Sequence, residues 1–407
     1  IGNNFKEIIM EFLIETLSNV TWQHAVMWLI GGVLIFLAIK KEMEPALLLP
    51  IGFGAILVNI PFSNTLTNTS YVCESCKQTF KQLVETCTAC GGKVVENTEV
   101  GIIEWLYEIG IEASEALPIL LFIGIGAMID FEPLIVNPKL MILGAFAQLG
   151  IFLTIILAVL CGFNISDAAS VGIIGAADGP TSILVAKTLG SGYLGAIVVV
   201  AYSYMALVPI IQPAVIKCIT SKKERLIRME YKGKKVSKIV KILFPIVITM
   251  VAGLIAPKSL ALVGFLMFGN LLNECGVLSS LADTAKNTLC NLITLLLGIT
   301  IAFQMQAEKF LQVETLTIMA LGLFAFVFDT VGGVMCAKVM NLFSKNKINP
   351  MVGAAGISAF PMSARVVHKI GIKEDPTNYL LMHAVGANVS GQIASAIVGG
   401  LIIGFVL

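Results

Sequence analysis

Charged residues are scarce in this chain. Asp, Glu, Lys and Arg make up 13% of the 407 residues, about half the share of an ordinary soluble domain. The net charge is only +1, so the protein has no overall positive field with which to hold nucleic acid. Hydrophobic residues make up 57% of the chain, and their continuous runs do not alternate as those of a membrane β-barrel do. We therefore expect an all-α, polytopic membrane protein that does not bind nucleic acid.

Several catalytic and energy-coupling motifs are also missing. The sequence contains no G-x4-G-K-[ST] loop for ATP, no G-x-S-x-G elbow for a nucleophilic serine, and no Ala-Met-Lys-Met string to carry biotin. If the protein moves a solute uphill, the energy must therefore come from outside these motifs.

The order of apolar and polar stretches predicts six regions. The basic segment, with eight Lys or Arg residues, is placed in the cytoplasm by the positive-inside rule. Lys40 and Lys41 indicate that the polar insert lies on the other side. The regions are an interfacial amphipathic helix (1–20), N-terminal membrane helices (21–62), the insert (63–100), a first membrane repeat (101–220), the basic loop (221–238) and a second membrane repeat (239–407).

The two membrane regions share a pattern around two glycine- and proline-broken stretches. Six positions between Gly172 and Gly190 recur, in register and without gaps, between Gly353 and Gly371. Paired interrupted helices in a duplicated sequence are typical of transporters whose site lies where the breaks meet. The alternative is that glycine-rich membrane segments align easily.

Asp178 lies in the first break, directly before Gly179 and Pro180. A carboxylate in an apolar segment costs about 2.5–3.5 kcal/mol to insert, so it is expected to face a cavity or a partner. Proline frees backbone carbonyls beside it. Together these groups can form an oxygen cage for a hard cation such as Na⁺. The alternative is that Asp178 caps the helix that follows.

The second break supplies neutral oxygen ligands and one cation. Asn349, Gly353 and Ser358 precede Pro361, and Arg365 follows it. A guanidinium in a mostly apolar region needs an anionic partner, either a protein carboxylate or a substrate carboxyl group. The alternative for Arg365 is an interfacial position at a helix end.

Four further polar residues lie in apolar segments. Asn388 is equally suited to helix packing and to ligation, and Tyr204 to proton relay and to packing. We expect His383 to make a structural hydrogen bond. Asp329 is a second buried acid without an assigned role.

The insert contains two thiol pairs, Cys73-x2-Cys76 and Cys87-x2-Cys90. This spacing is typical of a structural, four-cysteine zinc site of the zinc-ribbon kind. Disulfides are the alternative if the insert faces an oxidising compartment, and an iron site is the third option.

Four strings, at 175–181, 201–209, 360–366 and 375–384, closely resemble the β subunit of the sodium-pumping biotin-dependent decarboxylases. That family includes the oxaloacetate, glutaconyl-CoA, methylmalonyl-CoA and malonate enzymes. The resemblance covers about residues 101–407, and the insert departs from the family pattern.

The resemblance implies a prokaryotic inner-membrane subunit that decarboxylates carboxybiotin and couples this to Na⁺ export and proton uptake. By motif position it implies that Asp178 binds Na⁺ and carries the proton, and that Tyr204 lies on the proton path. It also ties a second group of positions to Na⁺ coupling: Asn349, Gly353, Ser358, Arg365 and Asn388.

The resemblance further implies an elevator-type core and a homotrimer. The expected partners are a biotin carrier protein, a carboxyltransferase subunit and a small membrane-anchored subunit. For the carboxybiotin that the resemblance implies, Arg365 can hold the carboxylate, while Asp178, Ser358 or Tyr204 delivers the proton. A free-standing carrier such as a Na⁺/H⁺ antiporter, or a purely structural membrane subunit, are the rival interpretations.

Overall fold

The computed structural model describes residues 18–42, 45–61, 63, 65–80, 84, 86–113, 115–230 and 236–407. The interfacial helix expected within 1–20 lies almost entirely outside the described residues. So do Lys232, Lys234 and Lys235 of the basic loop.

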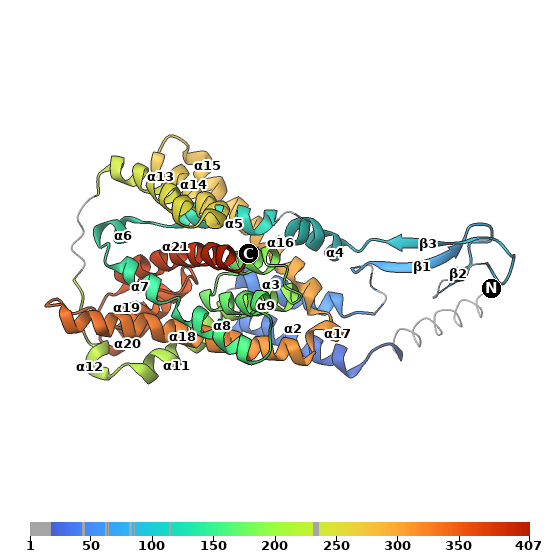
Figure 1. Cartoon of the computed structure of the whole chain (residues 1–407), viewed down its shortest axis with the longest axis horizontal. Helices are drawn as coiled ribbons and strands as arrows, with labels where there is room; N and C mark the ends of the chain where they lie inside the picture. Colours follow the sequence, from blue (N-terminus) through green and yellow to red (C-terminus); the bar gives the residue numbers. More distant parts are fainter. Residues whose placement is uncertain are drawn as a thin grey trace.

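The described residues form an elongated helical body with a small β-sheet projecting from one end (Figure 1). The polytopic helical fold is confirmed, because seven helical segments are long and apolar enough to cross a membrane. These segments are Trp22–Lys40, Leu140–Leu160, Leu194–Ile219, Lys238–Ile255, Ser279–Met305, Val313–Phe343 and Leu381–Val406. An eighth span results if Ile102–Ala113 and Ala116–Met128, which meet at 74°, are counted together.

The N-terminal part and the first membrane region contain the following elements: α2 (Trp22–Lys40), α3 (Pro45–Val58), β1 (Asn68–Cys73), β2 (Thr79–Phe80), β3 (Val94–Glu99), α4 (Ile102–Tyr107), η1 (Glu108–Ala113), α5 (Ala116–Met128), α6 (Glu132–Val136), α7 (Leu140–Phe146), α8 (Leu149–Leu160), α9 (Ile165–Gly172), η2 (Ile173–Ala176), α10 (Gly179–Thr188) and α11 (Leu194–Ile219). The strands form an antiparallel sheet in the order β2-β1-β3.

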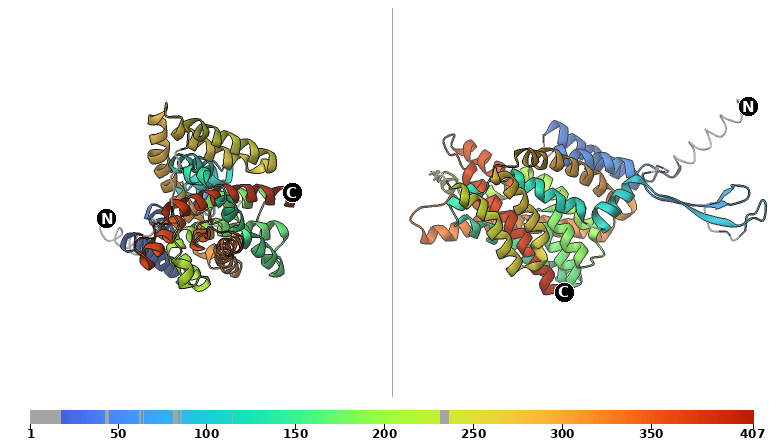
Figure 2. Two further views of the ribbon diagram at one scale, coloured as in Figure 1. Left: turned by 90° about the vertical axis from the view of Figure 1, so that its left-hand side faces the viewer. Right: turned by 90° about the horizontal axis from the view of Figure 1, so that it is seen from above.

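The remainder of the chain contains α12 (Lys222–Arg225), α13 (Lys238–Ile255), η3 (Pro257–Ser259), α14 (Leu260–Cys275), α15 (Ser279–Asp283), η4 (Thr284–Leu289), α16 (Cys290–Ile301), η5 (Ala302–Met305), α17 (Ala307–Phe310), α18 (Val313–Phe343), α19 (Met351–Ala354), α20 (Met362–Glu374) and α21 (Leu381–Val406). Figure 2 shows α13 and α14 together along one side of the body.

Helices α5 and α14 cross through two glycines in a reciprocal way. A Cβ on Gly126 would overlap the carbonyl of Leu266, and a Cβ on Gly269 would overlap the carbonyl of Ile123. The same offset of 143 residues relates Gly126 to Gly269 and Ile123 to Leu266. Only glycine allows the two backbones to approach this closely.

The sheet and the basic loop lie at opposite ends of the long axis (Figure 1). If the basic loop is cytoplasmic, the insert is on the outer side of the membrane. This arrangement agrees with the expectation drawn from Lys40 and Lys41.

A basic-loop clasp, residues 220–230, is held against the second half of the chain. Arg225 Nε lies 2.9 Å from Glu374 Oε1, and Arg228 Nε lies 2.8 Å from Asp375 Oδ2. Lys338 Nζ lies 3.0 Å from Glu224 Oε1. The clasp therefore connects the end of α11 to α18 and α20.

Candidate functional site

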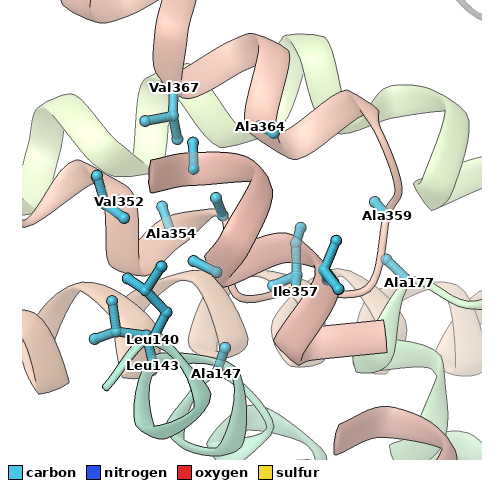
Figure 3. Packing of buried hydrophobic residues seen from close by; sticks show 14 of the residues in the cluster. Leu140, Leu143, Ala147, Ala177, Val352, Ala354, Ile357, Ala359, Ala364 and Val367 are labelled. Atoms are coloured by element: carbon cyan, nitrogen blue, oxygen red, sulfur yellow. The ribbon is translucent and has the colours of Figure 1, made fainter. Parts of the chain in front are cut away.

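Both predicted breaks are helix interruptions, and they meet. In the first, α9 and η2 end at Ala176, and α10 starts at Gly179. In the second, α19 ends at Ala354 and α20 starts at Met362. The backbone N–H of Ser358 donates to the carbonyl of Ala176 at 3.1 Å. Figure 3 shows Ala177 of the first break beside Ala359 of the second, within one buried cluster.

Asp178 is buried at this junction and is 3% exposed. It occupies the N-cap position of α10. Three side chains donate to its Oδ2 atom: the Thr181 hydroxyl at 2.5 Å, the Ser395 hydroxyl at 3.3 Å and the Gln392 amide at 3.4 Å. The carboxylate thus faces polar side chains of α21 and does not face hydrocarbon.

Helix α21 presents a polar face to the junction. Asn388, Gln392 and Ser395 follow the i, i+4, i+7 spacing of one helix face, and all three are buried. Asn388 Nδ2 donates to the carbonyl of Ile357 at 2.6 Å. The Asn388 Oδ1 and Gln392 Oε1 atoms are buried and accept no hydrogen bond from the described residues. Two unpartnered carbonyl oxygens therefore lie on the face of α21 that contacts Asp178 and the second break.

Ser358 belongs to this junction through both its backbone and its side chain. Its hydroxyl donates to the carbonyl of Gly391 on α21 at 3.0 Å. Gln212 of α11 holds the same break from another side, because its Nε2 atom lies 2.7 Å from both Ala354 O and Ser363 Oγ. The second break is therefore held by η2, α11 and α21 together.

Asn349 and Gly353 lie before the second break, where both contact neighbouring parts of the chain. Asn349 Nδ2 donates to the carbonyls of Arg225 and Ile227 at 2.9 and 2.8 Å. Its Oδ1 accepts the N–H of Met351 at 3.0 Å. Asn349 thus holds the basic-loop clasp, and no contact in the structure joins it to Asp178. Gly353 packs against the backbone of Gly333 on α18.

Tyr202 is the tyrosine that lies against the turn of the first break beside Asp178. A Cβ on Gly179 would overlap the Tyr202 ring, so this glycine lets the ring lie against the turn beside Asp178. The Tyr202 hydroxyl is buried and makes no hydrogen bond within the described part of the chain. The Tyr204 hydroxyl donates to the carbonyl of Met319 on α18 at 2.6 Å.

Arg365 is exposed on α20, and no carboxylate among the described residues pairs with it. A protein carboxylate, one of the two anionic partners that the sequence left open, is thus not found in the described part of the chain. A substrate carboxyl group and an interfacial position both remain compatible with its place.

Asp329 lies against the first break, but its side chain caps the N-terminus of the neighbouring helix α8. Its Oδ1 atom accepts the N–H of Ile151 at 3.2 Å, in the first turn of α8. A carboxylate at a helix N-terminus is favourably placed. Its Oδ2 atom is buried, has no hydrogen-bond partner within the part of the chain that the structure describes, and faces Gly175.

The four insert cysteines form one cluster. Their sulfur atoms all lie within 4.8 Å of one another, with 3.4 Å between Cys73 and Cys90 and 3.5 Å between Cys76 and Cys87. Tetrahedral zinc with bonds of about 2.3 Å needs sulfurs about 3.8 Å apart, so the residues fit this metal.

Two matching turns build the cluster. Each has a positive φ four residues after its first cysteine, at Lys77 and Gly91. The backbone N–H of Cys76 and the neighbouring thiols lower the pKa of Cys73 to about 6. A thiolate is the form that binds metal.

Comparison with known proteins gives a consistent result. The profile of the Na⁺-transporting oxaloacetate decarboxylase beta subunit family matches residues 23–406. The methylmalonyl-CoA decarboxylase subunit beta of Propionigenium modestum is 48% identical, over 93% of each chain.

Two further relatives are similar over nearly the whole chain. The glutaconyl-CoA decarboxylase subunit beta of Acidaminococcus fermentans is 44% identical over 95% of this chain and 94% of its own. The probable oxaloacetate decarboxylase beta chain of Vibrio cholerae is 42% identical over 96% of this chain and 97% of its own.

Proposed function

The chain belongs to the family of Na⁺-transporting decarboxylase beta subunits, and from this premise we propose how its residues perform the activity. It is a multi-pass inner-membrane subunit of a decarboxylase that transports sodium. In our proposal it removes CO₂ from carboxybiotin on a partner chain and couples this step to Na⁺ export and proton uptake. The observation that carries the proposal is the convergence of α21 and both breaks on Asp178.

The Na⁺ site proposed is the junction itself. The Asp178 carboxylate supplies the charge, and the unpartnered Asn388 Oδ1 and Gln392 Oε1 atoms supply neutral oxygens. Hard cations prefer such oxygen donors. Asn349 and Gly353 support the site by holding the second break in place.

Competition at one carboxylate provides the coupling. Asp178 cannot hold Na⁺ and a proton together, so protonation expels the ion. Exporting one charge against about 100 mV costs about 2.3 kcal/mol before any concentration gradient, so an exergonic step must drive the cycle. Decarboxylation is that step.

In the chemical step the bond between the ring nitrogen and the carboxyl carbon breaks. CO₂ leaves, the electron pair stays on the ring nitrogen, and a proton from the site neutralises that nitrogen. Asp178 is the proposed proton donor, and Tyr204, Tyr202 and Ser358 supply hydroxyls along the route. Arg365 is the proposed partner of the carboxylate before it leaves.

The remaining parts of the proposal concern motion and assembly. The core with the paired breaks moves as an elevator against the other helices. The subunit forms a homotrimer and works with a biotin carrier protein, a carboxyltransferase subunit and a small membrane-anchored subunit. The family resemblance supports these points.

The insert is proposed to hold structural zinc through Cys73, Cys76, Cys87 and Cys90. The single compact sulfur cluster supports this. Four thiolate ligands leave no open position, so the metal would stabilise the β-sheet and would not react.

Avidin sensitivity tests the function. Avidin binds biotin and so blocks the carrier chain. We therefore expect avidin to abolish Na⁺ uptake by inverted vesicles that contain the complete complex and are supplied with the acid that it decarboxylates. Uptake that persists in avidin, and also without the carrier chain, would identify a free-standing Na⁺/H⁺ antiporter instead.

A further inference from the structure

A groove of about 390 Å³ lies between α11 and α20. The apolar part of its wall comes mainly from Pro209 and Pro213 of α11 and Ile370 of α20. Three lysines line the same groove: Lys217, Lys369 and Lys373. The groove therefore combines an apolar surface with a cluster of positive charge, at a volume within the usual range of ligand pockets, about 300–1,000 Å³.

The charges on α20 form a ladder. Arg365, Lys369 and Lys373 are four residues apart, so they occupy successive turns of one face, and all three are exposed. The opposite face, with Ala364 and Val367, packs into the buried cluster (Figure 3). The ladder is thus a distinct surface of an amphipathic helix.

These cations are not neutralised by the described part of the protein. None of the three ladder residues, nor Lys217, pairs with a carboxylate there. Glu374, the acidic residue of the groove, is already paired with Arg225. The groove therefore carries positive charge that is not neutralised by these residues and that would attract an anion.

The ladder leads from the basic-loop end toward the second break. The Glu374–Arg225 pair holds the end of α20 at the clasp. At 1.5 Å per residue, Arg365 lies about 13 Å further along the helix and one turn after Pro361. Arg365 is not one of the residues that line the groove, but it is the next cation on the same face of α20, and it is exposed without a paired carboxylate among the described residues.

The facing wall of α11 contains two prolines. Pro209 and Pro213 lack the backbone N–H that would bond the carbonyls of Met205 and Pro209. Those carbonyls need other donors, which water in the groove can provide.

We propose that this groove receives the carboxylated biotin ring, an inference that rests on the proposed function. The carboxylate passes Lys217, Lys373 and Lys369 on its way to Arg365, while the apolar bicyclic ring lies against the prolines and Ile370. Carboxybiotin suits the groove because it carries one anionic group on an apolar body. The lysines act by attracting and guiding it, and they do not react.

A second cavity of about 620 Å³ opens at the same end of the molecule and is the natural comparison. It is also lined by three lysines, Lys139, Lys345 and Lys347. Glu230 lines it as well, and Lys347 already donates to the carbonyl of Asn341 at 2.7 Å. The lysines of this cavity are therefore less available to an anionic ligand. Among the described residues, no row of cations along one helix connects the cavity to the second break.

Two variants, each of which removes three positive charges, distinguish the groove from the second cavity. The groove variant carries K217Q, K369Q and K373Q, and the cavity variant carries K139Q, K345Q and K347Q. Each is assembled into the complete complex in vesicles and supplied with carboxylated carrier chain. Decarboxylation is measured against carrier concentration and ionic strength, with Na⁺ affinity measured separately without carrier.

We expect the groove variant to raise the KM for the carboxylated carrier about tenfold or more, with a weaker salt dependence and kcat changed less than twofold. The cavity variant should stay within twofold of wild type, and Lys→Arg changes at the three groove positions should restore KM. A larger effect of the cavity variant, or equal effects of both, would overturn the inference.

A lipid headgroup is the competing anion. If the groove variant keeps its KM but no longer responds to phosphatidylglycerol added to phosphatidylcholine vesicles, the groove binds lipid and the inference is wrong. Failure of the proposed function is recognised separately, because it would appear as Na⁺ pumping by Asp178→Asn.

Discussion

The carboxylate of Asp178 and the hydroxyl of Ser395 lie 3.3 Å apart, although 217 residues separate them in the chain. Asp178 begins α10 in the first half of the membrane region, and Ser395 lies on α21 near the end of the second. The ion site that we propose is therefore shared between distant parts of the sequence, and its two sides can be tested independently.

Asp178→Asn should reduce Na⁺ transport and Na⁺-stimulated carboxybiotin decay to background. The amide is nearly isosteric with the carboxylate but carries no charge and cannot exchange a proton at neutral pH. The measurement is ²²Na⁺ uptake by reconstituted vesicles. Undiminished pumping would remove Asp178 from the mechanism.

Gln392→Leu should raise the Na⁺ concentration needed for half-maximal activity by about tenfold or more. The change removes one neutral oxygen from a buried charge, and such a contact contributes about 1.5–3 kcal/mol. Ser390→Ala is the matched control, because the Ser390 hydroxyl on the same helix donates to the carbonyls of Leu140 and Ala387. Equal half-saturation in both variants would speak against Gln392 as a ligand.

Gly269→Ala should destabilise the protein by about 1–3 kcal/mol, because its methyl group would overlap the carbonyl of Ile123. Gly264→Ala on the same helix is the control. A methyl group there meets nothing closer than 3.9 Å, so the change should be neutral or slightly stabilising. Thermal unfolding in detergent measures both. Equal effects would mean that the α5–α14 crossing tolerates a side chain.

Purified protein, once denatured, should release about one zinc per chain to a chromogenic chelator. Replacing Cys73 and Cys76 by serine should abolish this release. Protein that contains neither metal nor free thiols in the insert would instead indicate disulfides, in agreement with an oxidising outer compartment.

Acid should loosen the basic-loop clasp. The Thr377 N–H and hydroxyl, together with Arg228, hold the pKa of Asp375 below its usual range. Stabilisation by this carboxylate is therefore full above the pKa of the unfolded chain, and it is lost as the pH falls through the lower, folded value.

Variants can imitate this protonation at neutral pH. Asp375→Asn with Glu224→Gln should speed tryptic cleavage after Arg225 and Arg228 several-fold, whereas Glu230→Gln should not. Glu230 forms no ion pair among the described residues. Unchanged cleavage would show that the Arg225–Glu374 pair and the Asn349 and Asn378 amides suffice to hold the clasp.

The sequence predicted the breaks and Asp178 because their signals are local. Closely spaced glycine and proline weaken a helix locally, and a carboxylate in an apolar run requires a partner. The side chains of α21 that donate hydrogen bonds to Asp178 were not predicted. Gln392 and Ser395 follow Asn388 at helical spacing in an apolar helix, and this polar stripe was the available signal.

Other residues depend on packing that no local pattern contains. Tyr202 and Tyr204 are neighbours in sequence, but the Tyr202 ring lies against Gly179 whereas the Tyr204 hydroxyl donates to Met319, and this difference is set by the rotation of α11. The Asn349 amide donates to carbonyls of the clasp, a contact that the local sequence does not reveal, and its part in Na⁺ coupling stays a prediction. The capping of α8 by Asp329 likewise joins segments 178 residues apart.

The position of α21 also matters while the protein is being made. Gln392 follows Asp178 by 214 residues, so the ribosome has inserted nearly every other helix before this partner leaves the exit tunnel. A nascent or prematurely terminated chain holds the acid without its counterpart.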